Sequence, residues 1–230
     1  MNIKITATCG DKSVSVECKR PSWESVRKAY REINEIGKGL DDYAKAELRY
    51  NLLGGKIQKA FKNEKTSYVN TCAVRVSYAL NYGGMPIEKS LLNNAKHNER
   101  HKTILQNIKN MAEKYNRIDK NNNYYITNSI DMETFLWIKW GTPEFLQKNI
   151  TDKFDNEVAL EKLKQLNKQG IITMRISFID ANGHTTLWDK DNFVDSTNYL
   201  TTYMIDDYGK THYNPIVTEI HFWELIGGLK

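Results

Sequence analysis

The sequence predicts an α+β fold, with helices first and an antiparallel sheet after them. Residues 171–179 and 183–188 are rich in β-forming side chains, so both segments are expected to be strands. Between them lies a sequence typical of a hairpin turn, Asp180-Ala181-Asn182-Gly183, which makes the two strands antiparallel. Most of the chain before residue 170 instead has the apolar spacing and the end signals of helices.

The first part of the chain is expected to form a hairpin, two helices and a loop. Residues 1–18 alternate apolar and polar side chains around Gly10, which indicates two short strands. Pro21 and Ser22 open a helix over residues 23–36, and a second helix is predicted over 40–50. The polar segment 65–70 is expected to be a loop.

The middle of the chain and its end contain the remaining predicted elements. Residues 88–123 are rich in lysine and asparagine and are interpreted as a helical insertion that ends in a polar loop. The elements expected after it are a short strand at 124–126, a helix from Asp131 to Trp140, a helix at about 156–169, and strands at 193–195 and 217–225.

Composition indicates a globular protein with one core. A chain of 230 residues, 40% hydrophobic and 27% charged, suits a single domain over residues 1–230. No apolar run approaches the ~18 residues that span a bilayer, so no membrane segment is expected. The N-terminus lacks the continuous apolar core of a secretory signal, so any export is expected to use another route.

Charge and cysteine usage exclude several classes of function. The net charge of +5 comes from Lys and Arg residues interleaved with acids, which indicates a mixed-charge surface and no nucleic-acid partner. Three cysteines form neither a zinc motif nor a disulfide framework, and neither metal nor cofactor is expected. Cys9 and Cys18 flank the predicted turn and either form a disulfide or remain unrelated thiols.

Cys72 is the candidate nucleophile. It begins a helix predicted over residues 71–80, with Asn70 or Thr71 as N-cap and two glycines as its stop. The first turn of a helix favours a thiolate, and its free N–H groups can bind an oxyanion. Arg75 and Tyr78 lie away from the apolar stripe of this helix and are its candidates for contact with the insertion or with an immunity protein.

His184 is the best candidate for the base among five histidines. It follows a turn glycine and opens a strand, whereas the others fit surface or sheet positions: His97, His101, His212 and His221. Asp189 lies on the opposite face of that strand and roughly 16 Å along it. Asp195 returns on the next strand, directly opposite or diagonal to His184, and is therefore its expected partner.

Two segments resemble a known family. The sequence Asn70-Thr71-Cys72-Ala73-Val74-Arg75-Val76-Ser77-Tyr78-Ala79-Leu80-Asn81 resembles the nucleophile helix of the fourth family of type VI secretion amidase effectors. The sequence Gly183-His184-Thr185-Thr186-Leu187-Trp188-Asp189 is similar to the histidine strand of that family. Further matches in the family's order are Arg20-Pro21-Ser22-Trp23, Gly54-Gly55-Lys56-Ile57, Trp140-Gly141-Thr142-Pro143 and His221-Phe222-Trp223. Residues 1–18 and 88–123 fall outside the pattern.

The resemblance implies a papain-like, NlpC-type cysteine peptidase fold, with the nucleophile at the start of a helix packed on an antiparallel sheet. It implies hydrolysis of peptidoglycan stem peptides between γ-D-glutamate and meso-diaminopimelate. Cys72 is then the nucleophile, its N–H an oxyanion donor, His184 the general base and acid, and Asp195 the residue that orients His184. The implied partners are the type VI secretion machinery and an immunity protein. The implied place of action is the periplasm of a target bacterium, after synthesis in the cytoplasm.

Two other functions are compatible with the residues. A papain-like cysteine acyltransferase would use the same triad and would prefer an amine acceptor to water. A non-catalytic binding module would require Cys72 to be an inert core thiol, which an alkylating reagent would leave unmodified at neutral pH.

Overall fold

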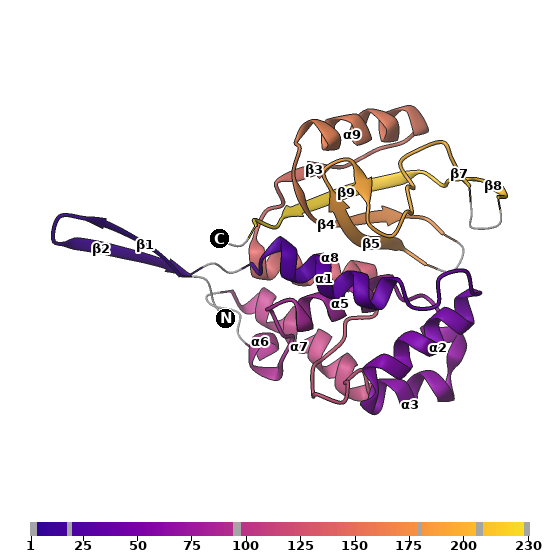
Figure 1. Ribbon diagram of the computed structural model, residues 1–230, viewed down its shortest axis with the longest axis horizontal. Helices are drawn as coiled ribbons and strands as arrows, with labels where there is room; N and C mark the ends of the chain where they lie inside the picture. The colour runs from indigo at the N-terminus through magenta and orange to yellow at the C-terminus, as the bar shows by residue number, and fades with distance from the viewer. Residues whose placement is uncertain (1–3, 18–19, 94–97, 179–180, 206–208, 228–230) are drawn as a thin grey trace.

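The computed structural model describes residues 4–17, 20–93, 98–178, 181–205 and 209–227. Its first element is a hairpin of β1 (Lys4–Cys9) and β2 (Lys12–Glu17), which projects from the rest of the chain (Figure 1). Cys9 lies exposed beside the turn. The possible disulfide with Cys18 lies outside the described residues.

The remaining chain forms a helical layer followed by a sheet layer, so the predicted α+β class is confirmed. The helices before the sheet are α1 (Trp23–Asn34), α2 (Asp42–Leu53), α3 (Gly55–Asn63), α4 (Lys65–Tyr68), α5 (Cys72–Tyr82), α6 (Lys89–Asn93), α7 (Glu99–Lys114) and α8 (Ser129–Trp140). Then follow β3 (Phe145–Gln147), α9 (Lys153–Gln165), β4 (Gln169–Ile176), β5 (Gly183–Asp189), β6 (Asn192–Phe193), β7 (Tyr203–Ile205), β8 (Thr211–Tyr213) and β9 (Val217–Glu224).

The sheet is antiparallel and has helices on both faces. Its strand order is β3-β9-β4-β5-β6, with β7 and β8 as a separate pair. In Figure 1, α9 lies above this sheet, and α1, α5 and α8 lie below it. Apolar side chains of β4, β5 and β9 therefore divide between a cluster under α9 and a larger cluster shared with α5 and α8.

Helix α5 is the centre of the helical layer. It packs against both α1 and β5, and all of its residues except Tyr82 are buried. The side chains of α1 that face it recur every three or four residues: Trp23, Val26, Tyr30 and Ile33. Ser22 caps α1 by accepting a hydrogen bond from the Ser25 N–H at 3.3 Å, which starts the helix where the sequence predicts.

The structure differs from the sequence-based expectation in several short segments. The loop predicted over residues 65–70 contains α4, because Tyr68 is buried with its ring edge against Tyr50. The strand predicted at 124–126 is reduced to one isolated bridge between Ile118 and Tyr124. Helix α3 and strands β3, β7 and β8 were not predicted. Within the described ranges, no helix has the length and apolar character needed to cross a bilayer.

One buried side chain connects α9 to the sheet. Asn156 is fully buried, its Nδ2 donates to the Val217 carbonyl at 2.8 Å, and its Oδ1 accepts from the Val217 N–H at 3.0 Å. The carboxamide thus pairs with both backbone groups at the first residue of β9. It takes the place of a neighbouring strand at this position.

Replacing this side chain tests how α9 is held to the sheet. Asn156→Leu keeps a similar volume but leaves a buried N–H and a buried C=O unpaired, so we expect the free energy of unfolding to fall by roughly 3 kcal/mol. Urea unfolding measures the change. Gln165→Leu, at an exposed position in the last turn of the same helix, is the control and is expected to have little effect. Equal stabilities of the two variants would contradict this role for Asn156.

Candidate active site

Cys72 is buried at the first position of α5, with 5% of its surface exposed. The residue at the N-cap position is Thr71, but its side chain makes no capping bond because its Oγ1 accepts from Arg49 Nη1 at 2.7 Å. Asn70 does the capping, since its Oδ1 accepts from the Cys72 N–H at 3.2 Å. Of the two predicted caps, the structure therefore selects Asn70.

His184 is the second residue of β5 and faces the start of α5. Glycine precedes it for a steric reason: a Cβ on Gly183 would lie 2.3 Å from the Met174 carbonyl oxygen on β4. The absence of that atom lets β5 pair closely with β4 at this point, where Met174 lies opposite His184.

Asp195 lies beside His184 through the register of β5 and β6. Trp188 pairs with Phe193, and the Val194 N–H donates to the Leu187 carbonyl at 2.9 Å. This is one of the two registers considered from the sequence. Asp195 Oδ2 then lies 2.9 Å from His184 Nε2, and its Oδ1 accepts from the Thr197 N–H at 3.2 Å. Asp189 faces away and pairs with Arg27.

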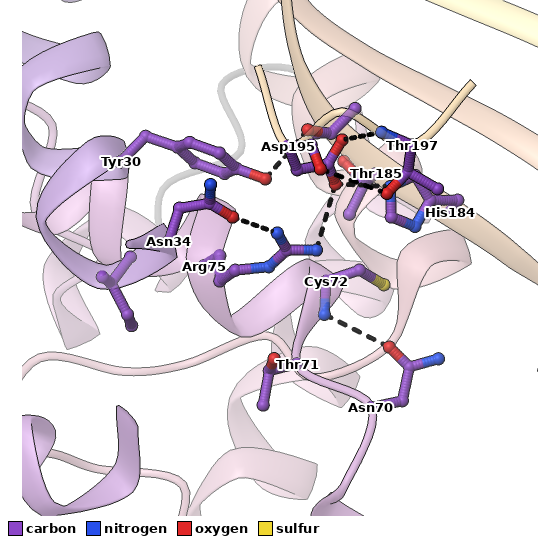
Figure 2. A network of polar contacts seen from close by, with 12 residues as sticks. Tyr30, Asn34, Asn70, Thr71, Cys72, Arg75, His184, Thr185, Asp195 and Thr197 are labelled. Carbon is purple, nitrogen blue, oxygen red and sulfur yellow. Dashed lines mark hydrogen bonds and ion pairs between the residues drawn. The ribbon is translucent and has the colours of Figure 1, made fainter. Parts of the chain in front are cut away.

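The structure brings Cys72, His184 and Asp195 together as a line of three neighbouring side chains (Figure 2). The Cys72 thiol lies beside the His184 side chain, and His184 and the Thr185 backbone N–H are among the groups that lower the pKa of the thiol. Because Nε2 of His184 is engaged by Asp195, Nδ1 is the ring nitrogen left for the thiol. The three side chains come from both layers of the fold: the thiol from the helices, the imidazole and the carboxylate from the sheet.

The electrostatics of this line shift both the Cys72 thiol and the His184 imidazole toward their charged forms. Burial opposes the charged form of the Cys72 thiol, but its hydrogen bond with His184 and the nearby positive charges lower its pKa overall. Burial likewise opposes the imidazolium, yet the Asp195 carboxylate and the Cys72 hydrogen bond raise the pKa of His184 to about 9. The pKa of Asp195 is lowered, against its burial, by His184 and Arg75.

Arg75 is a site residue that sequence reasoning missed. From the sequence it was a candidate for contact with the insertion or an immunity protein, but it is buried one turn after Cys72. Its Nη2 donates to Asp195 Oδ2 at 3.1 Å, and its Nη1 donates to Asn34 Oδ1 at the end of α1. Tyr78, the other candidate for such a contact, is buried in a core cluster with side chains of α1 and α2.

Aromatic side chains enclose the line. Tyr199 presents its ring to that of His184 at a centroid distance of 5.2 Å. Burial raises the pKa of Tyr199 to about 12, so its hydroxyl stays neutral at neutral pH. Tyr30 lies under the Arg75 guanidinium, and its hydroxyl is 2.8 Å from Thr186 Oγ1 on β5. These contacts hold the residues of both layers around the thiol.

The other histidines whose positions are described lie elsewhere. His101 is in the first turn of α7, His212 is in β8, and His221 is buried in β9 against Trp137 and Trp223. Burial lowers the pKa of His221 to about 4, so it is neutral at neutral pH. His97 lies outside the described residues. In the described part of the chain, no three His, Cys, Asp or Glu side chains are grouped to hold a metal ion.

Alkylation of Cys72 tests the electrostatics of the site without a substrate. Because the pKa of the thiol is lowered, we expect the rate at which iodoacetamide modifies Cys72 to rise at lower pH than the rate for an ordinary thiol, whose pKa is about 8.5. His184→Gln removes the partner and should move the rise of the rate to higher pH. Mass spectrometry of the Cys72 peptide measures the rate, with exposed Cys9 as the internal control. Equal rates at Cys72 and Cys9 at pH 7 would contradict this description.

Comparison with known proteins identifies the family. The model of type VI secretion system amidase effector protein 4, Tae4, matches residues 68–223. The solved complex of Tae4 with Tai4 from Enterobacter cloacae is 23% identical, with a TM-score of 0.57, over 90% of this chain and 99% of that chain. Tae4 from Salmonella typhimurium, solved with Tai4 from Enterobacter cloacae, is 21% identical, with a TM-score of 0.56 and the same coverage. No curated protein sequence gives a significant match.

These likenesses confirm the predicted fold: a papain-like α+β arrangement with the thiol at the start of a helix packed on an antiparallel sheet. The family model extends from α4 to β9 and therefore includes Cys72, His184 and Asp195. This chain belongs to the Tae4 family, the fourth family of amidase effectors of the type VI secretion system.

Proposed function

We propose that this effector hydrolyses the bond between γ-D-glutamate and meso-diaminopimelate in peptidoglycan stem peptides, with Cys72, His184 and Asp195 as its catalytic triad. The observation that carries the proposal is that the Cys72 thiol, the His184 imidazole and the Asp195 carboxylate lie together at the start of α5, with 2.9 Å between His184 Nε2 and Asp195 Oδ2. Membership of an amidase effector family supports amide hydrolysis as the reaction. The choice of bond rests on the resemblance of the cysteine helix and the histidine strand to those of the family.

The chemistry follows from the charge state of the site. The Cys72 thiolate attacks the amide carbonyl carbon, which forms an S–C bond and moves an electron pair onto the carbonyl oxygen. The His184 imidazolium then gives its proton to the amide nitrogen as the C–N bond breaks. The same imidazole then deprotonates a water molecule, which attacks the thioester carbon. The C–S bond breaks, the carboxylic acid product leaves, and the Cys72 thiolate and the His184 imidazolium are restored. Asp195 keeps the ring oriented and stabilises its positive charge.

The oxyanion donor is occupied in the free protein. The Cys72 N–H is the expected donor, and in the structure it donates to Asn70 Oδ1. A substrate carbonyl oxygen must therefore take the place of this side-chain oxygen to receive the bond. Asn70 is exposed, so its carboxamide can turn toward solvent when the substrate enters. In the free protein it satisfies a donor that would otherwise lack a partner beside the buried thiol.

The partner and the place of action follow from the same assignment. Tae4 proteins from two bacteria have been solved as complexes with the immunity protein Tai4. We infer that a cognate immunity protein inhibits this effector in the cell that produces it. A type VI effector is delivered into another bacterium, and a stem-peptide amidase would find its substrate in the periplasm of that cell.

Digestion of diaminopimelate-type peptidoglycan tests the reaction and the bond. We expect wild type to release stem fragments cut after D-glutamate and Cys72→Ala to release none, because no other group forms the thioester. Mass spectrometry of the soluble products identifies the bond, and circular dichroism confirms that the variant is folded. Full hydrolysis by Cys72→Ala would refute the assignment. Products carrying an added amine in place of water would point to an acyltransferase.

Substitution of Asn70 tests its position on the oxyanion donor. Asn70→Asp places a negative charge where the oxyanion develops and strengthens the competing hydrogen bond to the Cys72 N–H, so we expect kcat/KM to fall at least about tenfold. Asn70→Ser keeps a neutral capping oxygen and is the matched control, with an expected loss of no more than a few-fold. A soluble stem-peptide substrate allows both measurements. An aspartate variant as active as the serine variant would contradict this arrangement.

A further inference from the structure

Asp195, the third residue of the line, carries a full negative charge, and this charge disfavours the anionic form of the Cys72 thiol. An Asp195 carboxylate and a Cys72 thiolate are two anions on either side of a single His184 imidazolium. The Asp195 side chain is only 1% exposed, so water does little to screen it. Such a group of three carries a net charge of −1 in the interior. That charge would favour protonation of the thiol.

Arg75 is placed to cancel this charge. It lies three residues after Cys72 and therefore on the same side of α5. Its Nη2 donates to Asp195 Oδ2, the same oxygen that lies 2.9 Å from His184 Nε2. Its side chain is 10% exposed, so this ion pair is largely removed from solvent. With Arg75 included, the ionised groups of the site sum to zero.

Other residues hold the guanidinium in this position. Asn34 Oδ1, at the last residue of α1, accepts from Nη1. The ring of Tyr30, one turn earlier on α1, lies 5.6 Å from the guanidinium carbon. The cation thus lies between α1 and the end of the β5–β6 hairpin. Its position is determined by contacts that need no substrate.

The remaining charged and titratable groups around the site do not replace it. Arg49 on α2 also bears a charge, but it donates to neutral oxygens: Thr71 Oγ1 and the carbonyls of Ile33 and Asn34. Asp42, at the start of α2, is exposed. Burial raises the pKa of both Tyr30 and Tyr199, so these two phenols are neutral at neutral pH.

We propose that Arg75 is a positioning residue for the amidase reaction: its buried guanidinium neutralises Asp195 and thereby lets Cys72 exist as an anion near neutral pH. The inference rests on the role of Cys72 in the proposed function and deepens it. Where the third residue of a cysteine–histidine pair is a neutral amide, no such cation is needed. Here Asp195 occupies that position, and Arg75 supplies the positive charge that balances it.

A charge cycle with two substitutions tests the proposal. Arg75→Gln leaves the site at −1, Asp195→Asn leaves it at +1, and the double variant returns it to zero. Iodoacetamide alkylation of Cys72, followed against pH by mass spectrometry, gives the midpoint at which the thiolate forms. We expect the midpoint to be lowest for Asp195→Asn, similar for wild type and the double variant, and highest for Arg75→Gln. Arg75→Gln should exceed wild type by at least about one pH unit.

Two further variants separate charge from structure. Arg75→Lys keeps the charge and should retain most of the wild-type profile, although it loses the second hydrogen bond. Arg27→Gln removes another arginine that pairs across α1 and β5, with Asp189 at 2.8 Å, and should leave the midpoint unchanged. A purely structural role for Arg75 would reduce activity without this order of midpoints.

The outcomes that overturn the proposal are specific. The proposal is refuted if the midpoint of Arg75→Gln equals that of wild type. It is also refuted if the midpoint of the double variant equals that of Arg75→Gln. If Arg75→Gln does not fold, the double variant compared with Asp195→Asn measures removal of the same charge, and equal midpoints refute the proposal. The assay contains no peptidoglycan. A Cys72→Ala protein that still hydrolysed peptidoglycan would therefore refute the proposed function while leaving the charge cycle to be judged separately.

Discussion

The contact between the first turn of α5 and the start of β5 is the constraint on which the site depends. There the Cys72 thiol lies beside His184, which is among the groups that lower the pKa of the thiol. Several features elsewhere maintain that contact. Glycine at position 183 allows β5 to lie close against β4, and Asn70 fixes the N–H with which α5 begins. Helix α1 packs along α5 and also contacts β5, through Tyr30 and Thr186.

Burial makes the polar groups of this contact strong and also makes them interdependent. A carboxylate removed from water must be paired, and Asp195 is paired with His184 and Arg75 through one oxygen. Arg75 in turn depends on the end of α1 through Asn34. A helix distant in sequence from the thiol therefore contacts the charged groups beside it. The helical layer contains both the Cys72 thiol and the cation that pairs with Asp195.

The features that could be predicted from the sequence are those that depend on neighbouring residues, such as helix caps and strand alternation. The thiol at a helix start follows from capping signals, and the pairing of Trp188 with Phe193 follows from strand alternation and a short turn. Arg75 escaped prediction because amphipathic spacing assigns polar residues to solvent, whereas α5 is enclosed on nearly all sides. The arginine within a helix otherwise rich in apolar and small residues was the available signal. Strands β3, β7 and β8 are too short to show a period, and the helix at 65–68 depends on the distant partner of Tyr68, the Tyr50 ring.

The division of the site between two layers has a consequence for how the protein loses activity. Helices and strands keep their own backbone hydrogen bonds when the layers separate slightly. The thiol and the imidazole belong to different layers, so they move apart. A displacement of an ångström or two at the interface of α5 and β5 breaks the contact while the secondary structure stays intact. On heating, inactivation should therefore precede the loss of helical signal. Activity should therefore report on the packing between the helical layer and the sheet.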